Sequence, residues 1–333
     1  MKILVTGGAG FIGSAFIRYV LKEKQDAIIN IDNLTYASNK DCLDEFKKHD
    51  RYSFFKVDIN DTKQILKILI DTKPDVLVHF AAETHVDQSI TNPNAFIETN
   101  VLGTLSLLNA SLDYLKQTKL QKFLFHHIST DEVFGDLSPD DEKFTESSNY
   151  FPSSPYSASK ASSDHLVRAF SRTYGLDAIV TNCSNNYGPN QHREKLIPKT
   201  ILNAIEGNII PVYGNGKQIR DWLYVEDHVK ALYLILSSNK KSTSYCIGGD
   251  NEIMNLDVVF KICNILNNLI PEEKRACKDF KSLIEFVSDR PGHDYRYAIN
   301  SNKLKNELGW HQEETFDSGL FKTVKWYCSN KTH

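Results

Sequence analysis

Short apolar runs alternate along the first half of the chain with longer stretches whose apolar residues recur at helical spacing. The runs predict strands at Lys2–Thr6, Ala27–Asp32, Ser53–Asp58, Asp75–Ala82, Lys122–Thr130 and Asp177–Ser184. The longer stretches predict amphipathic helices at Phe11–Lys22, Thr62–Leu69, Asn100–Leu115 and Tyr156–Tyr174. Nearly continuous apolar strands that alternate with helices are typical of an α/β fold with a doubly wound parallel sheet.

The pattern changes after about Ser184, where glycine and proline become more frequent. Short strands are predicted at Ile210–Tyr213 and Trp222–Val225, and helices at His228–Leu236, Leu256–Asn267, Ser301–Leu308 and Phe316–Trp326. We therefore expect a smaller C-terminal α/β lobe that is interleaved with the sheet domain. The expected division gives residues 1–184 and about 219–247 to the sheet domain, and about 185–218 and 248–333 to the lobe.

Composition excludes several classes of function. The 333 residues include 39 basic and 42 acidic side chains, and a net charge of −3 gives no reason to expect nucleic acid or an anionic membrane as a partner. No apolar run approaches the roughly 18 residues that a membrane helix needs, and no secretory signal precedes the first strand. The cysteines form no C-x-x-C pair, which indicates reduced thiols and no metal site. We expect a cytoplasmic protein.

A glycine cluster joins the first predicted strand to the first predicted helix. Gly7, Gly10 and Gly13 have the spacing G-x-x-G-x-x-G, a variant of the dinucleotide-binding fingerprint of Rossmann folds. Glycine permits a tight turn and close approach of a pyrophosphate, which the helix N-terminus attracts. Asp32 ends the second strand, where a carboxylate hydrogen-bonds the adenosine ribose and repels a 2′-phosphate, so NAD is favoured over NADP. Asp58 ends the third strand and either faces the adenine or caps the strand.

Tyr156 and Lys160 lie one turn apart on a predicted helix and share a face. An ammonium group beside a phenol stabilises the phenolate, so this pair predicts a lowered tyrosine pKa and a base for a hydroxyl proton. The pattern Y-x-x-x-K is common on ordinary helices. Its place after a glycine loop and a fifth parallel strand favours a catalytic role.

The glycine loop and the tyrosine–lysine pair together resemble the extended short-chain dehydrogenase/reductase family, whose members act on nucleotide sugars. In that family the two residues work beside the nicotinamide of NAD, and a serine or threonine after the fifth strand assists them. The resemblance implies this assisting role for Thr130. It covers residues 2 to about 310, and Phe134 stands where many members have tyrosine.

Thr130, Asp131 and Glu132 resemble the signature of the nucleotide-sugar 4,6-dehydratases within this family. Hydride transfer alone, as in a 4-epimerase, gives two adjacent carboxyl groups no task. A dehydratase must also remove a carbon-bound proton and protonate a leaving hydroxyl, which carboxyl groups in different protonation states can do. Asp131 must then be protonated at the elimination step, with a pKa raised by burial or by the charge of Glu132. Other sugar-nucleotide dehydratases usually carry a different pair, for example with lysine in place of the glutamate.

The resemblance implies dTDP-glucose as the substrate and NAD as the cofactor, with Tyr156, Lys160, Thr130, Asp131 and Glu132 as the catalytic residues. The implied cofactor contacts are Gly7, Gly10, Phe11, Ile12, Gly13, Asp32, Asn33, Leu34, Thr35, Asp58, Ile59, Phe80, Ala81, Ala82, Thr99, Tyr156, Lys160 and Asn186. The implied substrate contacts are Thr84, Thr130, Asn185, Lys195, Leu196, Pro211, Tyr213, Arg220, Asn255, Asp289, Arg290 and His293.

Alternatives stay open at this point. A UDP-sugar 4,6-dehydratase or a 4-epimerase uses the same scaffold, and a non-catalytic NAD-binding regulatory protein would keep the fold without the chemistry. Lys195, Arg220 and Arg290 suit diphosphate binding, but basic side chains more often form surface ion pairs. Asn255 either caps a helix or contacts the pyrophosphate.

Family members usually pair through two long helices, which implies a homodimer. In this chain the helices are Asn100–Leu115 and Tyr156–Tyr174, and Leu102, Leu105 and Leu108 are consistent with an apolar outer face. Packing against the chain's own sheet explains the same residues equally well.

Overall fold

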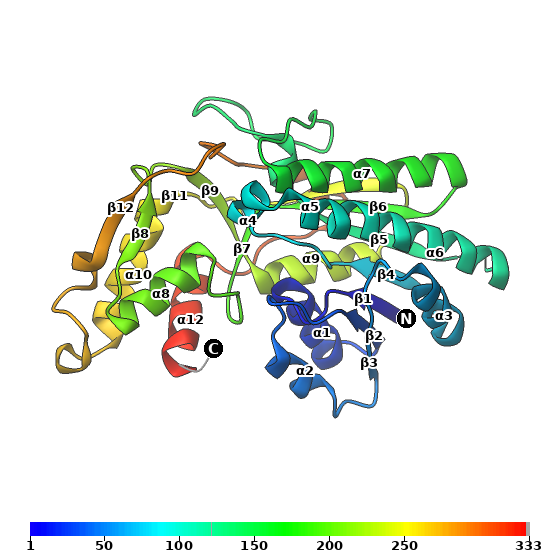
Figure 1. Ribbon diagram of the computed structural model, residues 1–333, viewed down its shortest axis with the longest axis horizontal. Helices are drawn as coiled ribbons and strands as arrows, with labels where there is room; N and C mark the ends of the chain where they lie inside the picture. The colour runs from blue at the N-terminus through cyan, green and yellow to red at the C-terminus, as the bar shows by residue number, and fades with distance from the viewer. Residues whose placement is uncertain (121, 331–333) are drawn as a thin grey trace.

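A seven-stranded parallel sheet forms the larger part of the protein (Figure 1). The computed structural model describes residues 1–120 and 122–330. The strands are β1 (Lys2–Thr6), β2 (Ala27–Asp32), β3 (Tyr52–Lys56), β4 (Val76–His79), β5 (Leu124–Thr130), β6 (Ala178–Cys183) and β10 (Thr243–Ile247). Their order is β10-β6-β5-β4-β1-β2-β3, with all neighbours parallel. The direction of winding reverses at β1, and in doubly wound sheets the crevice at such a point binds the ligand.

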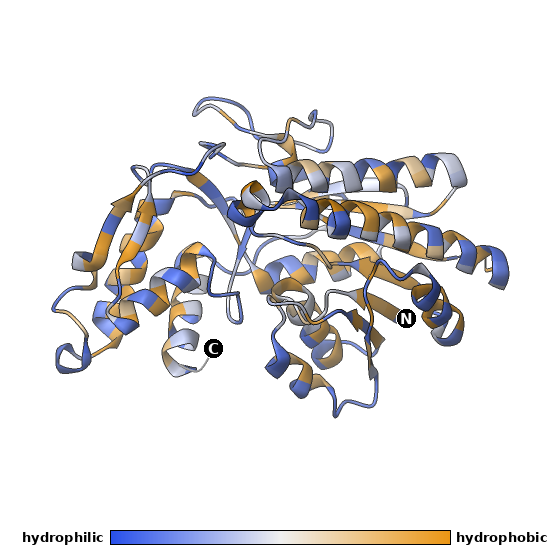
Figure 2. Ribbon diagram, viewed as in Figure 1, coloured by the Kyte–Doolittle hydropathy of each residue, from blue (hydrophilic) through white to orange (hydrophobic). Residues whose placement is uncertain are grey.

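Helices cover both faces of the sheet because successive strand residues point to opposite sides. Ile3 and Val5 of β1 belong to the core formed with α1 (Phe11–Glu23) and α9 (Val225–Ser237). Leu4 belongs to the core on the other face. The helices of that face are α3 (Thr62–Thr72), α6 (Gly103–Thr118) and α7 (Pro155–Tyr174). Figure 2 shows the strands near the N-terminus as almost wholly apolar, as expected for a sheet covered on both sides.

A smaller lobe lies beside the sheet domain, on the left of Figure 1. Its strands form one sheet of order β11-β9-β7 and another that pairs β12 with β8. Its main elements are β7 (Asn185–Tyr187), α8 (Leu196–Glu206), β8 (Ile210–Tyr213), β9 (Ile219–Tyr224), β11 (Glu252–Met254), α10 (Asn255–Leu269), β12 (Ile284–Val287) and α12 (Phe316–Ser329). The apolar faces of these helices form a separate core.

The chain passes between the two parts more than once. β9 lies in the sheet of the smaller lobe, whereas α9 and β10, which follow it, complete the larger sheet and its helical layer. The segment that returns to the sheet domain therefore begins at α9. The remaining elements are α2 (Lys40–Phe46), α4 (Val86–Thr91), α5 (Pro93–Phe96), the π-helix η1 (Ile97–Leu102), the 3₁₀ helices η2 (Asp131–Phe134), η3 (Glu272–Lys274) and η4 (Phe280–Leu283), and α11 (Asn302–Leu308). In the part of the chain that the structure describes, no helix is long and apolar enough to span a bilayer.

The predicted α/β class and doubly wound sheet are confirmed, and the predicted strands of the first half lie within a few residues of β1 to β6. Of the two interpretations of Leu108, packing against the chain's own sheet is confirmed, because this side chain is fully buried there. Leu102, by contrast, is 49% exposed at the end of η1, and Leu105 is only partly buried.

Candidate active site

The loop between β1 and α1 approaches neighbouring backbone too closely for any side chain. Gly7 has a φ of 74°, and a Cβ on it would lie 2.5 Å from the backbone nitrogen of Ala81. A Cβ on Gly13 would lie 2.3 Å from the carbonyl oxygen of Gly7. Gly10 precedes the first residue of α1, so the N-terminus of this helix opens onto the loop. Backbone N–H groups and glycine in this arrangement fit a dinucleotide pyrophosphate.

Asp32 organises the loop after β2. Its Oδ2 accepts a hydrogen bond from the Ala9 N–H at 2.9 Å. Its Oδ1 accepts from the Leu34 N–H at 2.8 Å and from the Ser38 hydroxyl at 3.2 Å. Asp32 thus joins the end of β2 to the glycine loop and holds a carboxylate at the edge of the space between them.

A first cavity runs along this edge. It is lined by Gly7, Gly10, Ile31, Asp32, Asn33, Thr35, Ala37, Ser38, Asp58, Ile59, Phe80, Ala81, Ala82, Glu83 and Thr99. Leu34, which was expected to contact the cofactor, is not among these residues. Asp58 lines the cavity and also accepts the Asn60 N–H at 2.8 Å, so it caps the turn after β3, and its contact with adenine stays a prediction.

A central cavity continues from the first, because Gly7, Gly10 and Phe80 line both. The predicted residues that line it are Gly7, Gly10, Phe11, Ile12, Gly13, Phe80, Ala82, Thr84, Thr130, Asp131, Glu132, Tyr156, Lys160, Asn185, Asn186 and Lys195. The tyrosine, the lysine and the two carboxyl groups therefore meet at one place beside the glycine loop.

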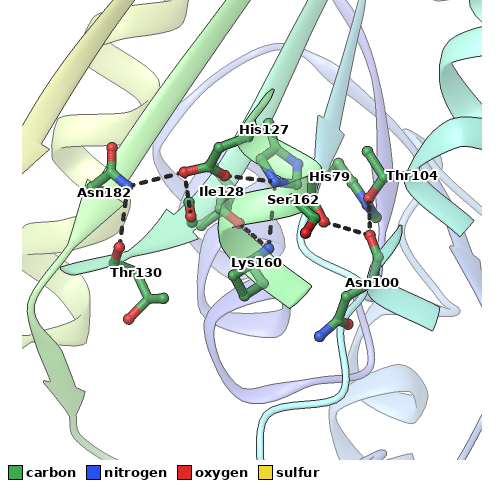
Figure 3. A network of polar contacts seen from close by, with 12 residues as sticks. His79, Asn100, Thr104, His127, Ile128, Thr130, Lys160, Ser162 and Asn182 are labelled. Atoms are coloured by element: carbon green, nitrogen blue, oxygen red, sulfur yellow. Dashed lines mark hydrogen bonds and ion pairs between the residues drawn. The ribbon is translucent and has the colours of Figure 1, made fainter. Parts of the chain in front are cut away.

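Tyr156 and Lys160 are positioned by the start of α7. The Ser154 hydroxyl accepts the Ser157 N–H at 3.1 Å, and Pro155 occupies the first turn, so the helix begins at a defined residue. Tyr156 is 7% exposed and Lys160 4%. The Lys160 ammonium donates to the carbonyl of Ile128 at 2.8 Å, and its Nζ lies 3.5 Å from Nε2 of His127 (Figure 3).

The predicted lowering of the Tyr156 pKa is wrong for this structure. Burial and the nearby charge of Glu132 raise the pKa of the Tyr156 phenol well above its usual value. The Lys160 ammonium is engaged by the backbone of β5. Spacing along a helix placed the two residues on one face, but it did not reveal this competing carbonyl.

Thr130 ends β5 and begins the turn that carries the carboxyl groups. Its hydroxyl accepts the Glu132 N–H and donates to Oδ1 of Asp131, each at 3.3 Å. The turn then forms the short helix η2. Asp131 is 1% exposed, and its Oδ2 has no hydrogen-bond partner among the residues that the structure describes.

The two carboxyl groups have different electrostatic surroundings. Burial and the charges of Glu132 and Asp221 raise the pKa of Asp131 well above its ordinary range, as the elimination chemistry requires. Burial also raises the pKa of Glu132, but the charges of Arg290 and Arg220 oppose that rise. Asp131 is therefore the better proton donor, and Glu132, facing cations, the better base.

An outer cavity extends from Glu132 into the smaller lobe. The predicted residues that line it are Thr84, Glu132, Asn185, Lys195, Leu196, Pro211, Tyr213, Arg220, Asn255, Arg290 and His293. Asp289 does not line it. Instead its carboxylate contacts Nδ1 of His293 at 2.6 Å and accepts from the Gln218 amide at 2.9 Å.

The cations of the outer cavity differ in their partners: Lys195 pairs with Glu194 and Arg290 with Asp87, whereas Arg220 is held by backbone carbonyls. Arg220 is 5% exposed, donates to the carbonyl of Asp294 at 2.9 Å and lies over the ring of Tyr297. Lys195 donates to the carbonyl of Thr84 at 2.8 Å. These contacts leave the cations facing the cavity, where an anionic group can bind them.

Two further cavity residues complete this picture. Arg290 pairs with Asp87 at 3.3 Å, but its buried Nε has no partner. Asn255 is the first residue of α10, and the cap position before it is occupied by Met254, so the capping interpretation of Asn255 is wrong. The buried Oδ1 of Asn255 has no partner, which leaves it available to a ligand.

Sequence reasoning missed several polar residues around the site. Glu194 lines both the central and the outer cavity and lies between His85 and His192. Asp164, one turn beyond Lys160, is fully buried and lies 3.2 Å from Nε2 of His127. Only the spacing of Asp164 from Lys160 could have indicated it. Among the described residues, no group of three or more His, Cys, Asp or Glu side chains is arranged to hold a metal ion.

Comparison with known proteins defines the class. A sequence profile of the GDP-mannose 4,6 dehydratase family matches residues 4–323, and the chain belongs to this family. It is 56% identical over 342 aligned residues to a dTDP-glucose 4,6-dehydratase of Escherichia coli, covering 99% of this chain and 94% of the relative. The enzyme of the same name from Haemophilus influenzae is 53% identical, with 100% and 99% of the two chains covered.

Solved structures show the same likeness. A dTDP-glucose 4,6-dehydratase from Streptomyces venezuelae, solved with NAD and dTDP bound, has a TM-score of 0.91 and 40% identity, with 99% of this chain and 98% of that chain covered. A UDP-glucose 4-epimerase from Thermotoga maritima, solved with UDP-glucose, has a TM-score of 0.86 but only 25% identity, with coverage of 99% and 100%.

Proposed function

We propose that this protein converts dTDP-glucose to dTDP-4-keto-6-deoxyglucose and water, as a hydro-lyase with tightly bound NAD. The observation that carries the proposal is the position of Asp131 and Glu132, which line the same cavity as Tyr156, Lys160 and the glycine loop. A binding protein has no use for this set of groups. Identities of 53% to 56% over nearly the whole chain to enzymes of this name support the same activity.

The first and central cavities suit NAD. The crowded glycine loop leaves backbone N–H groups for the pyrophosphate, and Asp32 is placed for the ribose hydroxyls. When bound, NAD accepts a hydride from C4 of the sugar and later returns it to C6. We assign the remaining predicted cofactor residues to this contact, apart from Leu34, which lies outside the cavities.

Three side chains supply the proton transfers. Tyr156 removes the proton of the 4-hydroxyl in its phenolate form. The hydroxyl of Thr130 and the charge of Lys160 favour this form against the effects of burial and Glu132. The 4-ketone acidifies the proton on C5, which Glu132 removes while Asp131 protonates the departing 6-hydroxyl as water. When the hydride returns to C6, the protonated Glu132 gives a proton back to C5. Because Asp131 acts as an acid only when protonated, elimination declines as pH rises through its raised pKa.

The outer cavity suits the nucleotide diphosphate. Arg220, Arg290 and Lys195 supply positive charge on a protein of net charge −3, and the unpaired Oδ1 of Asn255 can accept a hydrogen bond from a donor of the nucleotide sugar. Guanidinium groups match the geometry of phosphate oxygens. We assign the other predicted substrate residues to this cavity, apart from Thr130, which lines the central cavity, and with Asp289 acting through His293.

We further propose a homodimer. Ile97 and Leu102 of η1 are 45% and 49% exposed, and Leu105 and Leu112 of α6 and Leu166 of α7 are only partly buried. These residues lie on adjoining helices whose apolar area a second copy can cover.

We also propose a cytoplasmic location, because the scattered, mostly buried thiols fit a reducing compartment. We keep the division into a sheet domain and a smaller lobe, with the chain returning to the sheet domain at α9.

The experiment is to incubate the purified protein with dTDP-glucose without added NAD and to measure the alkali absorbance of a 4-keto-6-deoxy product. Product formation is expected, and it also shows that the cofactor co-purifies. A galactose epimer as the only product would contradict the roles of Asp131 and Glu132. The same assay with UDP-glucose tests the choice of nucleotide.

A further inference from the structure

The carboxylate of Asp164 lies beneath the catalytic groups but takes no part in the steps above. Asp164 is one turn beyond Lys160 on α7, with no exposed surface. A buried charge is strongly destabilising unless several partners compensate for it. The segments that supply these partners are therefore the segments that the carboxylate connects.

The partners of Asp164 come from three other segments. Its Oδ1 lies 3.2 Å from Nε2 of His127 on β5. Its Oδ2 accepts from the Ser129 hydroxyl at 2.9 Å, the Tyr150 hydroxyl at 2.7 Å and the Asn182 amide of β6 at 3.2 Å. One carboxylate thus ties the catalytic helix to two strands of the sheet and to the loop before the helix.

Two of these partners reach the catalytic groups directly. Nε2 of His127 lies 3.5 Å from the Lys160 ammonium, and the Asn182 amide also donates to the carbonyl of Thr130 at 3.1 Å. Figure 3 shows Lys160 directed toward His127 and Ile128, and Asn182 directed toward Thr130. Asp164 is therefore one side chain away from both the lysine and the start of the carboxyl-bearing turn.

We propose that Asp164 is a positioning residue whose carboxylate keeps Lys160 charged and in place and, through Asn182, fixes the Thr130 turn relative to α7. This role rests on the proposed function of the same site. The residues of α7 then have different tasks. Tyr156 and Lys160 contact the substrate and the cofactor, and Asp164 holds α7 in position against the sheet.

The charges around Lys160 give the direction of the expected pH effect. Burial lowers the pKa of Lys160 to about 8, and the charge of Asp164 opposes this fall. The other titratable or charged groups around the pair are His79 of β4, His127 of β5, Cys183 of β6, Tyr150, and Tyr156 and Arg168 of α7. Burial lowers the pKa of both imidazoles and raises that of the thiol and the phenols, so in the protein without ligands these five groups stay uncharged near neutral pH. Removing the carboxylate lowers the pKa of Lys160 further, and the active, protonated lysine is then lost at lower pH.

The test is the pH profile of Asp164→Asn for reduction of the bound cofactor by dTDP-glucose. We expect the alkaline limb to move toward acid by about one pH unit and kcat at pH 8 to fall about fivefold, with little change in KM. Asp227→Asn is the matched control, because Asp227 is also a buried carboxylate but binds the N–H groups of Glu313 and Glu314. The control should lower Tm and leave the profile in place. A folded Asp164→Asn protein with the wild-type profile would overturn the proposal.

A second pair of variants separates positioning from general destabilisation. If Asp164 acts through Lys160, then Asp164→Asn should cause no further loss of kcat in a Lys160→Met background, and additive losses would contradict the proposal. Should Asp164→Asn fail to fold, Tyr150→Phe removes one donor and keeps the charge. It should lower kcat about fivefold at constant KM, and an unchanged kcat would overturn the proposal.

The same measurements distinguish failure of the proposed function from failure of the proposed role of Asp164. A wild-type protein that forms no 4-keto-6-deoxy product from dTDP-glucose would overturn the proposed function and the role of Asp164 together. A wild-type protein that is active, with a variant profile identical to its own, would overturn only the role of Asp164.

Discussion

The cavity beside the glycine loop and the cavity of the smaller lobe accommodate charged ligand groups in different ways. The first uses the backbone of one continuous segment, in which Gly7 and Gly13 lie against other main-chain atoms. The outer cavity uses side chains, with Lys195, Arg220 and Arg290 coming from separate segments. A backbone site suits a cofactor that stays bound through each cycle, whereas separate side chains suit a substrate that must enter and leave.

We call the cavities beside the glycine loop the cofactor side and the outer cavity the substrate side. The largest effect is expected at Glu132, which lines both. In Glu132→Gln, elimination should fall about 1,000-fold because the base for the C5 proton is lost. Hydride transfer belongs to the cofactor side and should persist, so NADH absorbance should appear without the 4-keto-6-deoxy product. Tyr156→Phe is the matched variant and should block both signals. Loss of NADH formation in Glu132→Gln would show that hydride transfer also depends on Glu132 and would contradict this separation of roles.

On the cofactor side, NAD binding should be most sensitive to substitutions that add a side-chain atom to a glycine of the loop. In Gly13→Ala the new Cβ would lie 2.3 Å from the Gly7 carbonyl oxygen, so the loop must move. We expect little NAD to co-purify and activity to fall about 100-fold. Gly10→Ala is the graded control, because its Cβ would lie 3.2 Å from the same oxygen. Equal NAD content in the Gly13 variant and the wild type would disprove the backbone account.

The substrate side should respond to truncation through KM. Arg290→Gln removes a guanidinium whose Nε is buried and unpaired, and we expect KM for dTDP-glucose to rise about 30-fold with kcat nearly constant. Arg193→Gln is the control, because that side chain is 58% exposed and pairs with Glu206 on the surface. A large fall in kcat at constant KM would instead assign Arg290 to the chemistry.

The smallest effect is expected at Asn255. Asn255→Ala should raise KM about fivefold, the cost of one neutral hydrogen bond. The thermal midpoint should stay unchanged, because the side chain caps no helix. A lowered midpoint at constant KM would restore the capping interpretation.

The sequence predicted the cofactor side better than the substrate side, for a physical reason. Strand periodicity and glycine spacing are local, so β1, the loop and α1 could be recognised in one short segment. The cations of the outer cavity could be placed only through family resemblance, because their meeting depends on how β9 and the segment before α11 fold together.

Other features depend on tertiary contacts that no local pattern contains. The raised pKa of Tyr156 follows from burial and from Glu132, and Lys160 is engaged by the carbonyl of Ile128. The strand β10 is short and begins with Thr243 and Ser244, so its apolar signal is weak. These residues become a strand because the edge of β6 is available to pair with them.

The position of β10 has a consequence for how the protein is made. β10 pairs with β6, with Thr243 opposite Ile179, yet about 60 residues, first those of the smaller lobe and then α9, separate the two strands in the chain. During synthesis from the N-terminus, β6 therefore emerges from the ribosome well before its partner. Until then the apolar edge of the sheet at Ile179 is open to pairing with other chains. The nascent chain is accordingly most prone to aggregate in this interval, which ends when the return through α9 delivers β10 to the sheet.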